Sequence, residues 1–225
     1  MRLDTKRGTN FLLARKIELT ALQCGIRIKA ARPFFAYLSV SGFLQLRRDT
    51  VFNNYLDFCD HVALEAMLVR AFITKHKLGG QVLIDHICYR CHSKDWYDYV
   101  SKMLAHEDVS NFAHQVWLSG RRVNYFGFVK PIEVGHGHIR YAEVQDAKPL
   151  DVEESRFHHI EIYPASAADA FGELVAFLKA AGENLVFKPR PHHDTYDVTL
   201  EGKLIVRISQ GPLVKKIGRE LARLS

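Results

Sequence analysis

Two histidines occupy matching positions in two similar segments of the chain, and histidine is a common ligand of divalent metals. Residues 85–89 read Asp-His-Ile-Cys-Tyr and residues 158–162 read His-His-Ile-Glu-Ile, so that His86 aligns with His159. Apolar and β-branched residues surround both histidines, which is typical of strands. If the two strands pair in one sheet, the two imidazoles can meet across a cleft and share an ion.

A carboxylate from a neighbouring strand would complete a set of two histidines and one acid. Such a set suits a divalent transition metal and leaves coordination positions open for a substrate. Glu143 is the first candidate, because it ends a predicted strand at residues 139–144 and shares a face with Tyr141. Glu161 is the competing candidate, since strand alternation places it on the same face as His159. The alternative interpretation is that both histidines are hydrogen-bonded within buried strands, or lie on the outer face of the sheet, and bind no metal.

Two arginines could bind an anion beside these groups. Arg90 shares a strand face with His86 and Cys88, and Arg121 lies in the turn that joins two later strands. A guanidinium can hold a carboxylate through two parallel hydrogen bonds. Both side chains are therefore candidates for binding substrate charge if they face the cleft. Surface or structural ion pairs are the alternative.

Other kinds of catalytic chemistry are not favoured. Residues 88–92 match the C-x-x-C-H pattern of covalent haem attachment, but a strand would direct Cys88 and Cys91 to opposite faces. The same geometry argues against a redox pair of cysteines, which also needs a helix N-terminus to lower a thiol pKa. The sequence has neither a G-x-S-x-G nucleophile turn nor a glycine-rich phosphate loop before a helix.

The predicted elements follow the same order twice. The first series has a strand at residues 82–91 and a helix at 93–105, and the second has a strand at 156–163 and a helix that ends at Gly182. Three further strands follow in each series, at residues 113–118, 123–129 and 139–144, and at residues 185–188, 196–200 and 204–209. An internal repeat of this size is a stronger indicator of fold than any single element.

This repeat predicts an α+β fold in which two βαβββ modules pair into one curved mixed sheet around a cleft. Module one spans residues 82–145 and module two spans residues 156–210. Apolar residues at helical intervals predict N-terminal helices in a lead-in at residues 49–80 that starts at Asp49 and Thr50. A closing helix is expected at residues 212–224.

Composition and charge narrow the functional classes. Of the 225 residues, 48% are apolar and 25% are charged, as in an average soluble globular protein, and no apolar run approaches the roughly 18 residues of a membrane-spanning helix. Residues 1–48 hold ten of the 31 Lys and Arg residues but two of the 25 acids, which leaves 21 basic and 23 acidic residues elsewhere. The basic character therefore belongs to an N-terminal extension, and we expect neither nucleic-acid binding nor membrane association.

Residues 1–48 are expected to form a poorly ordered basic extension, while residues 49–225 form the folded domain. The extension shares its arginine-rich, acid-poor character with mitochondrial import signals, which is the alternative if the source is eukaryotic. Four cysteines are too few for a disulfide-rich secreted module. A reducing compartment, the cytoplasm, is therefore expected.

Several segments resemble the YecM family of bacterial proteins. The most specific are residues 85–92, which read Asp-His-Ile-Cys-Tyr-Arg-Cys-His, and residues 159–162, which read His-Ile-Glu-Ile. The resemblance covers roughly residues 50–220 and includes Gly120-Arg121, Pro131, Val134, His136, Glu143, Val198-Thr199 and Gly202-Lys203. The family is similar in fold to the vicinal oxygen chelate superfamily of glyoxalases, bleomycin-resistance proteins and dioxygenases, whose modules are βαβββ.

The resemblance implies a metal-binding protein whose ligands come from the first and last strands of each module. Carried onto this sequence, the ligand positions are His86, Glu143 and His159. The fourth position would fall on the last strand, which holds Arg207 and Ser209 but no carboxylate. The resemblance therefore implies three protein ligands, with water completing the coordination sphere.

Two functions are open at this point. The first is a metal-dependent enzyme of isomerase, lyase or dioxygenase type, in which a divalent ion (Zn, Ni, Fe or Mn) acts on adjacent oxygens of a small oxygen-rich or carboxylate substrate. Glu161 would be the general base, and the substrate would contact Arg90, Arg121 and Tyr141. The second is a non-catalytic protein that binds a small ligand in the same cleft. Either could be a monomer or a homodimer.

Overall fold

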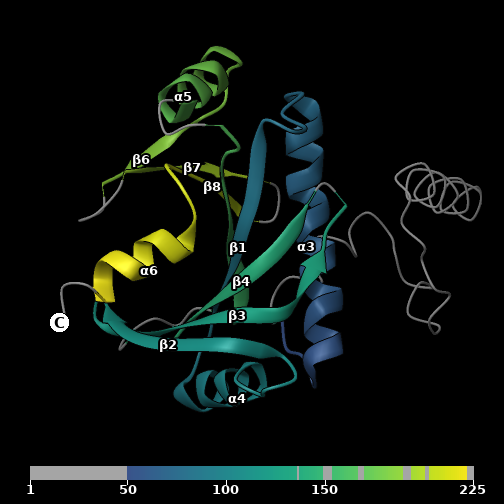
Figure 1. The fold of residues 1–225 in the computed structure, drawn as a ribbon, viewed down its shortest axis with the longest axis vertical. Coiled ribbons are helices and arrows are strands. Elements are labelled where there is room, and N and C mark those ends of the chain that lie inside the picture. Colours follow the sequence, from purple (N-terminus) through teal and green to yellow (C-terminus); the bar gives the residue numbers. More distant parts are fainter. Residues whose placement is uncertain are drawn as a thin grey trace, which may run out of the picture. The chain divides into compact units, whose positions relative to one another are not determined.

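The computed structural model of the chain describes residues 50–135, 137–148, 154–166, 170–189, 194–200 and 203–221 (Figure 1). The chain divides into two units, Met1–Arg48 and Asp49–Ser225, and the description below concerns the second. The basic extension expected at residues 1–48 lies outside the described residues, as do His136 and Gly202 of the family-like segments.

One mixed sheet of eight strands forms the centre of the domain, in the order β2-β3-β4-β1-β5-β8-β7-β6. The first half of the chain contributes β1 (Val82–Arg90), β2 (Ser110–Leu118), β3 (Arg121–Glu133) and β4 (His138–Gln145). The second half contributes β5 (Arg156–Pro164), β6 (Val186–Lys188), β7 (Thr195–Thr199) and β8 (Ile205–Ser209).

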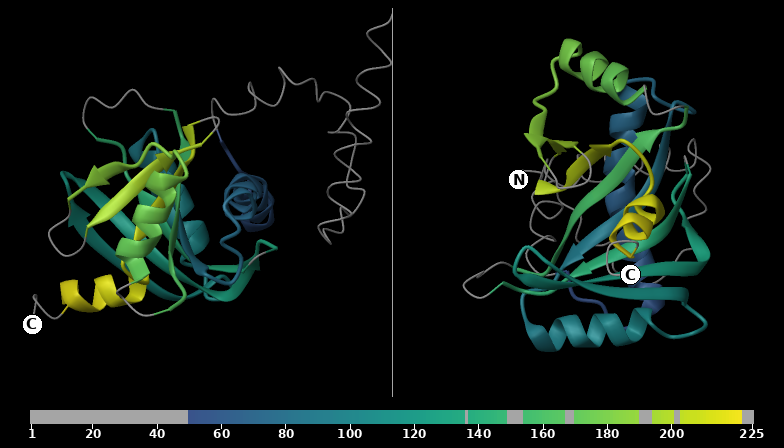
Figure 2. Two further views of the ribbon diagram at one scale, coloured as in Figure 1. Left: turned by 90° about the horizontal axis from the view of Figure 1, so that it is seen from above. Right: turned by 60° about the vertical axis from the view of Figure 1, so that its left-hand side comes forward.

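The two halves of the sheet have the same connectivity. In each, the first strand pairs in parallel with the last, β1 with β4 and β5 with β8, and the other neighbours are antiparallel. β1 and β5 pair antiparallel at the centre and so join the halves. The predicted α+β fold of paired βαβββ modules is therefore confirmed. Figure 2 shows the strands changing direction across the sheet, as the usual twist requires.

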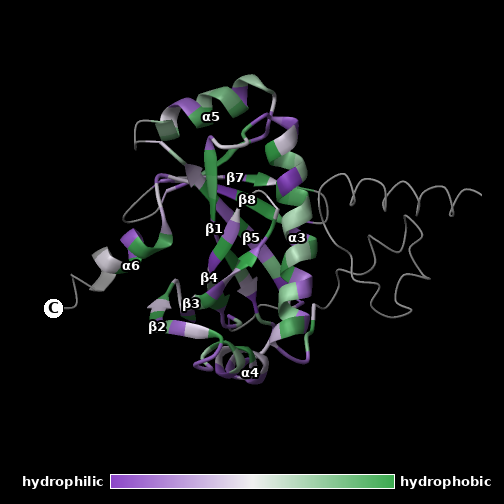
Figure 3. Ribbon diagram, turned by 45° about the vertical axis from the view of Figure 1, so that its right-hand side comes forward, coloured by the Kyte–Doolittle hydropathy of each residue, from purple (hydrophilic) through white to green (hydrophobic). Residues whose placement is uncertain are grey.

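Three helices cover one face of the sheet. They are α3 (Tyr55–Lys75), α4 (Lys94–Leu104) and α5 (Ala170–Ala180), and their buried side chains join those of the strands in one large apolar core. The buried residues of α3 recur at helical spacing: Phe58, Val62, Ala66, Val69, Phe72 and Ile73. Figure 3 shows hydrophobic and hydrophilic residues alternating along this helix, as expected when one face is buried.

The lead-in is a single helix that begins later than the sequence indicates. Asn54 caps it, rather than Asp49 or Thr50, and the Asn54 side-chain oxygen accepts a hydrogen bond from the Asp57 N–H at 3.0 Å. α4 follows Ser93 as expected, with the hydroxyl of that residue as its cap. None of the described helices is both long and apolar enough to cross a lipid bilayer.

The closing helix α6 (Leu213–Leu221) lies on the opposite side of the sheet from α3, as Figures 1 and 2 show. Its residues Leu213 and Ile217 pack against Val123 and Tyr125 of β3 in a second, smaller apolar cluster. α6 thereby covers part of the sheet face on which the polar residues of the central strands gather. The candidate site lies between this helix and the sheet.

Candidate functional site

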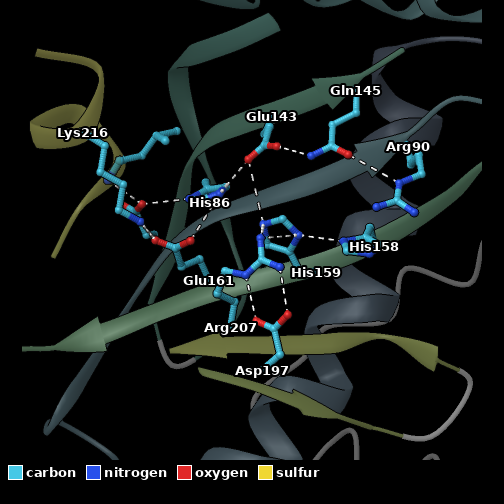
Figure 4. A network of polar contacts seen from close by, with 12 residues as sticks. His86, Arg90, Glu143, Gln145, His158, His159, Glu161, Asp197, Arg207 and Lys216 are labelled. Atoms are coloured by element: carbon cyan, nitrogen blue, oxygen red, sulfur yellow. Dashed lines mark hydrogen bonds and ion pairs between the residues drawn. The ribbon is translucent and has the colours of Figure 1, made fainter. Parts of the chain in front are cut away.

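Strand pairing brings polar side chains from three adjacent strands together. Cys88 of β1 lies opposite Glu143 on β4 and opposite His159 on β5. His86 precedes Cys88 by two residues and so shares its face. Glu161 follows His159 by two residues and likewise shares the face of that histidine. Figure 4 shows the two histidines and the two glutamates pointing toward a common region.

A β-bulge in β1 shapes the centre of the site. The register between β1 and β5 shifts between Ile84 and Ile87, which leaves Asp85 and His86 together opposite Glu161. Both side chains are buried. In a regular strand, alternation would place these two neighbours on opposite faces, so the bulge is what allows them to interact.

The Asp85 carboxylate makes two contacts through one oxygen. Its Oδ2 accepts a hydrogen bond from His86 Nδ1 at 2.9 Å and another from the backbone N–H of Leu213, the first residue of α6, at 2.7 Å. Because this oxygen also accepts the Leu213 N–H, it acts as an acceptor, and the proton is assigned to Nδ1. The other ring nitrogen, Nε2, therefore faces the glutamates.

The four side chains at the centre lie close to one another. His86 Nε2 lies 3.4 Å from Glu143 Oε2 and 3.9 Å from Glu161 Oε2, and His159 Nε2 lies 3.9 Å from Glu143 Oε2. The two imidazole centroids are 5.5 Å apart. Ligand-type atoms of His86, His159 and Glu161 all lie within 4.8 Å of one another, and all four residues are buried.

The electrostatics of the centre are those of a buried, strongly coupled cluster. Burial by itself lowers the pKa of His86, but Glu161, Asp85 and Glu143 outweigh burial and raise that pKa to about 9. Burial raises the pKa of Glu143, but the nearby His86 imidazole and a hydrogen bond from Gln145 together lower it to about 2. The carboxylate is therefore ionised and the imidazole has a high affinity for a cation, whether a proton or a metal.

Two fixed cations also reach the centre. Arg207 of β8 binds Asp197 of β7 through two hydrogen bonds of 2.8 and 2.9 Å, and its Nη1 lies 3.1 Å from His159 Nε2. Lys216 of α6 contacts Glu161. Burial raises the pKa of Glu161, but Lys216, His86 and Ser209 together outweigh burial and lower it. A guanidinium thus occupies the place on β8 where the family resemblance puts a fourth ligand.

The chemistry of the donors fits a divalent transition metal. His86 Nε2 is buried and has no hydrogen-bond partner among the described residues, while Nδ1 is held by a carboxylate, as in most metal-binding histidines. Glu143 supplies an ionised oxygen next to this nitrogen. His159 and Glu161 are less accessible as ligands, because Arg207 and Lys216 already contact them.

A second group of possible ligands lies beside the first. Cys88, His158 and His159 bring sulfur and nitrogen atoms within 4.8 Å of one another. Burial and then three guanidinium groups, those of Arg90, Arg207 and Arg156, lower the pKa of His158 to about 3. The positive charge that keeps this imidazole neutral also opposes binding of a metal cation there.

A cavity of about 300 Å³ extends from the centre between the sheet and α6. Arg90 and Arg121, the candidates for binding substrate charge, are among the residues that line it. Gln145 connects them to the centre. Its Oε1 lies 3.4 Å from both Arg90 Nε and Arg121 Nη1, and its Nε2 donates to Glu143 (Figure 4).

Tyr141 has a different place from that of the other predicted substrate contacts. It lies on the same face as Glu143, but it packs against the apolar cluster beneath α6 and is not among the residues that line the cavity. The fold thus brings His86, Glu143, His159 and Glu161 together and places Arg90 and Arg121 in the wall.

Four residues of the site were not predicted from the sequence as its members: Asp85, Gln145, Asp197 and Lys216. Asp85 directly precedes His86, and this Asp-His pair is the one feature of the sequence that could have indicated a role for Asp85 in the site. Lys216 comes from a helix that is separate in the chain from both modules, and nothing local in the sequence indicates where that helix docks.

The paired βαβββ modules give the domain the vicinal-oxygen-chelate-like fold expected from the sequence, with a buried cluster of histidines and glutamates at its centre. The family model described as YecM protein matches residues 48–202, more than half of the chain, and the chain belongs to the YecM family. No curated protein matches it in sequence.

One solved structure shares the fold, and others match it more weakly. The structural-genomics protein EC4020 matches with a TM-score of 0.54 at 17% identity, covering 72% of this chain and 91% of that one. Streptomyces coelicolor methylmalonyl-CoA epimerase matches with a TM-score of 0.39 at 14% identity, covering 57% and 96%. The Mn(II)-bound glyoxalase from Novosphingobium aromaticivorans matches with a TM-score of 0.34 at 18% identity, covering 57% and 39%. The likeness to EC4020 is one of fold.

Proposed function

We propose that this protein is a metal-dependent enzyme of the vicinal oxygen chelate type that acts on a small oxygen-rich or carboxylate substrate. His86, Glu143 and His159 would hold the metal, and for His159 to bind it the Arg207 guanidinium would have to move from its contact with the imidazole. The proposal depends on one observation above all. His86 Nε2 is buried without a hydrogen-bond partner among the described residues, faces the Glu143 carboxylate, and belongs to a ring that Asp85 fixes from the other side.

A divalent metal bound here would polarise substrate oxygens as a Lewis acid. The chain's own residues would do the rest. Arg90 and Arg121 would bind the substrate's negative charge at the far wall of the cavity. Glu161 would be the base, since its lowered pKa keeps it ionised and its Oε2 faces the centre. For Glu161 to take a proton, the ammonium of Lys216 must move from its contact with the other oxygen.

The proposal is tested by metal content and affinity. The purified protein, incubated with Zn²⁺, Ni²⁺, Mn²⁺ or Fe²⁺ and then desalted, should retain one metal ion per chain, measured by mass spectrometry. His86→Ala and Glu143→Gln should lose that metal. His138→Ala is the control, because His138 is half-exposed and contacts Glu133 at the surface. A wild-type protein that binds none of these metals would overturn the proposal.

A second function is favoured by one observation, the position of Arg207. Its guanidinium contacts His159 Nε2, where the resemblance implies a metal site, and a fixed positive charge there suits an anionic ligand without a metal. A non-catalytic protein that binds a small organic acid in the same cavity would use this charge. Stabilisation by organic acids in excess chelator, unchanged in His86→Ala, would favour this function over the metal enzyme.

A further inference from the structure

A second hollow, of about 430 Å³, opens beside the cavity of the candidate site. It lies among the start of α4, the hairpin between β2 and β3, and the segment that follows β4. Arg121 and Lys148 line both hollows. The two spaces therefore share a wall that carries two cationic side chains, and a single ligand could extend from one into the other.

The inner cavity carries an excess of positive charge. Its wall contains two acids, Glu143 and Glu161, and five basic side chains, those of Arg90, Arg121, Lys148, Arg207 and Lys216. Asp197 offsets the charge of Arg207, but the excess remains. Since residues 49–225 as a whole are slightly acidic, this concentration of cations is particular to the cavity. It favours a ligand with an anionic group.

The outer hollow offers an aromatic surface. Trp117 of β2 lines it and is 72% exposed, whereas the other tryptophan, Trp96, packs against the core and donates a hydrogen bond to the Tyr89 hydroxyl at 2.7 Å. A large exposed indole beside cationic groups is a suitable surface for a planar ring, because aromatic rings gain dispersion energy from stacking. The apolar part of a ligand would therefore lie against Trp117.

We infer that the ligand is an elongated organic anion with an aromatic ring. The ring lies on Trp117 in the outer hollow, the phosphate or carboxylate binds Arg121 and Lys148 at the junction, and the remaining oxygen-bearing part enters the inner cavity. The chemical identity of the oxygen-bearing part of the ligand rests on the proposed function, since this part would meet the metal that His86 and Glu143 would hold. The ring and the anionic group do not depend on a metal.

The inference is tested with the full chain in excess chelator, using 1-naphthyl phosphate, 1-naphthol and inorganic phosphate as probes in calorimetric titrations. 1-Naphthyl phosphate should bind about tenfold or more tightly than inorganic phosphate, as expected for one stacked ring. Trp117→Ala should remove this advantage and leave phosphate binding unchanged. Phe187→Ala, which removes a half-exposed aromatic from the opposite edge strand, should have no effect.

Two further variants test Arg121 and Lys148, the cationic residues that line both hollows. Lys148→Gln should weaken both phosphate and 1-naphthyl phosphate, and Arg121→Gln should do the same if the buried substitution leaves the protein folded. Equal affinity for the two phosphates in the wild type, or an unchanged preference in Trp117→Ala, would overturn the inference. Failure of the metal proposal is distinguishable, because His86→Ala should lose metal but still prefer 1-naphthyl phosphate.

Discussion

The Asp85 Oδ2 oxygen lies 2.9 Å from His86 Nδ1, and this contact determines which nitrogen of the histidine faces the site. The same oxygen accepts the backbone N–H of Leu213 at 2.7 Å. One carboxylate therefore orients the imidazole and holds the first residue of α6 against the sheet. The orientation of the candidate ligand and the closure of the cavity are linked through this side chain.

Asp85→Asn should weaken metal binding by about 10- to 100-fold, as is typical when the partner of a metal-binding histidine is changed. The amide is neutral, so it supports the basicity of the imidazole less than the carboxylate does. Competition with a chelator of known affinity measures the change. Asp60→Asn, at an exposed position of α3, is the control. Equal metal affinity in Asp85→Asn and the wild type would contradict the role given to this contact.

The metal-free protein should lose stability as the pH rises from about 6.5 to about 9. The pKa of His86 is raised from 6.5 to about 9 in the folded protein. The resulting stabilisation is complete below the unfolded value and is lost as the pH passes the folded one. Urea unfolding in chelator at several pH values measures the loss. His86→Gln should show a shallower dependence in this interval, and an identical one would contradict the prediction.

Lys216→Met should increase metal affinity. The lysine ammonium contacts Glu161, and its removal leaves a buried carboxylate without its cation, which favours a metal in its place. An increase of about tenfold in metal affinity corresponds to a free energy of about 1.4 kcal/mol by which the lysine competes with the metal. Lys215→Met changes the exposed neighbour on the same helix and should leave the affinity unchanged. An affinity in Lys216→Met no higher than in this control would show that the lysine does not compete.

Asp197→Leu should lower the free energy of unfolding by about 3 kcal/mol, because it leaves the buried Arg207 guanidinium without the carboxylate that binds it through two hydrogen bonds. Adding Arg207→Met should recover much of the loss, since a buried pair replaced by apolar residues costs little. Chemical denaturation measures both. Lys94→Met, which breaks an exposed ion pair with Asp98, should have no measurable effect. A double variant less stable than Asp197→Leu would contradict this account.

Strand alternation and the internal repeat predicted most of the side chains that the fold brings together at the centre of the sheet. Period-two patterns predicted which strand positions share a face, and the alignment of His86 with His159 predicted two equivalent strands. In the fold these strands pair at the centre of the sheet. These features are local or repeated in the chain, so they can be recognised without knowing how distant segments pack. The same rule anticipated Glu143 and Glu161 as neighbours of the histidines.

The tertiary structure alone decided the places of Asp85, Lys216 and Tyr141. The bulge that turns Asp85 beside His86 depends on the register with β5, which is set by packing across the whole sheet and not by the alternation within β1. Lys216 reaches Glu161 because α6 folds back onto β3, and Tyr141 is covered by that same helix. Contacts between segments so far apart in the chain arise when apolar surfaces pair, and no local pattern of residues specifies which surfaces will meet.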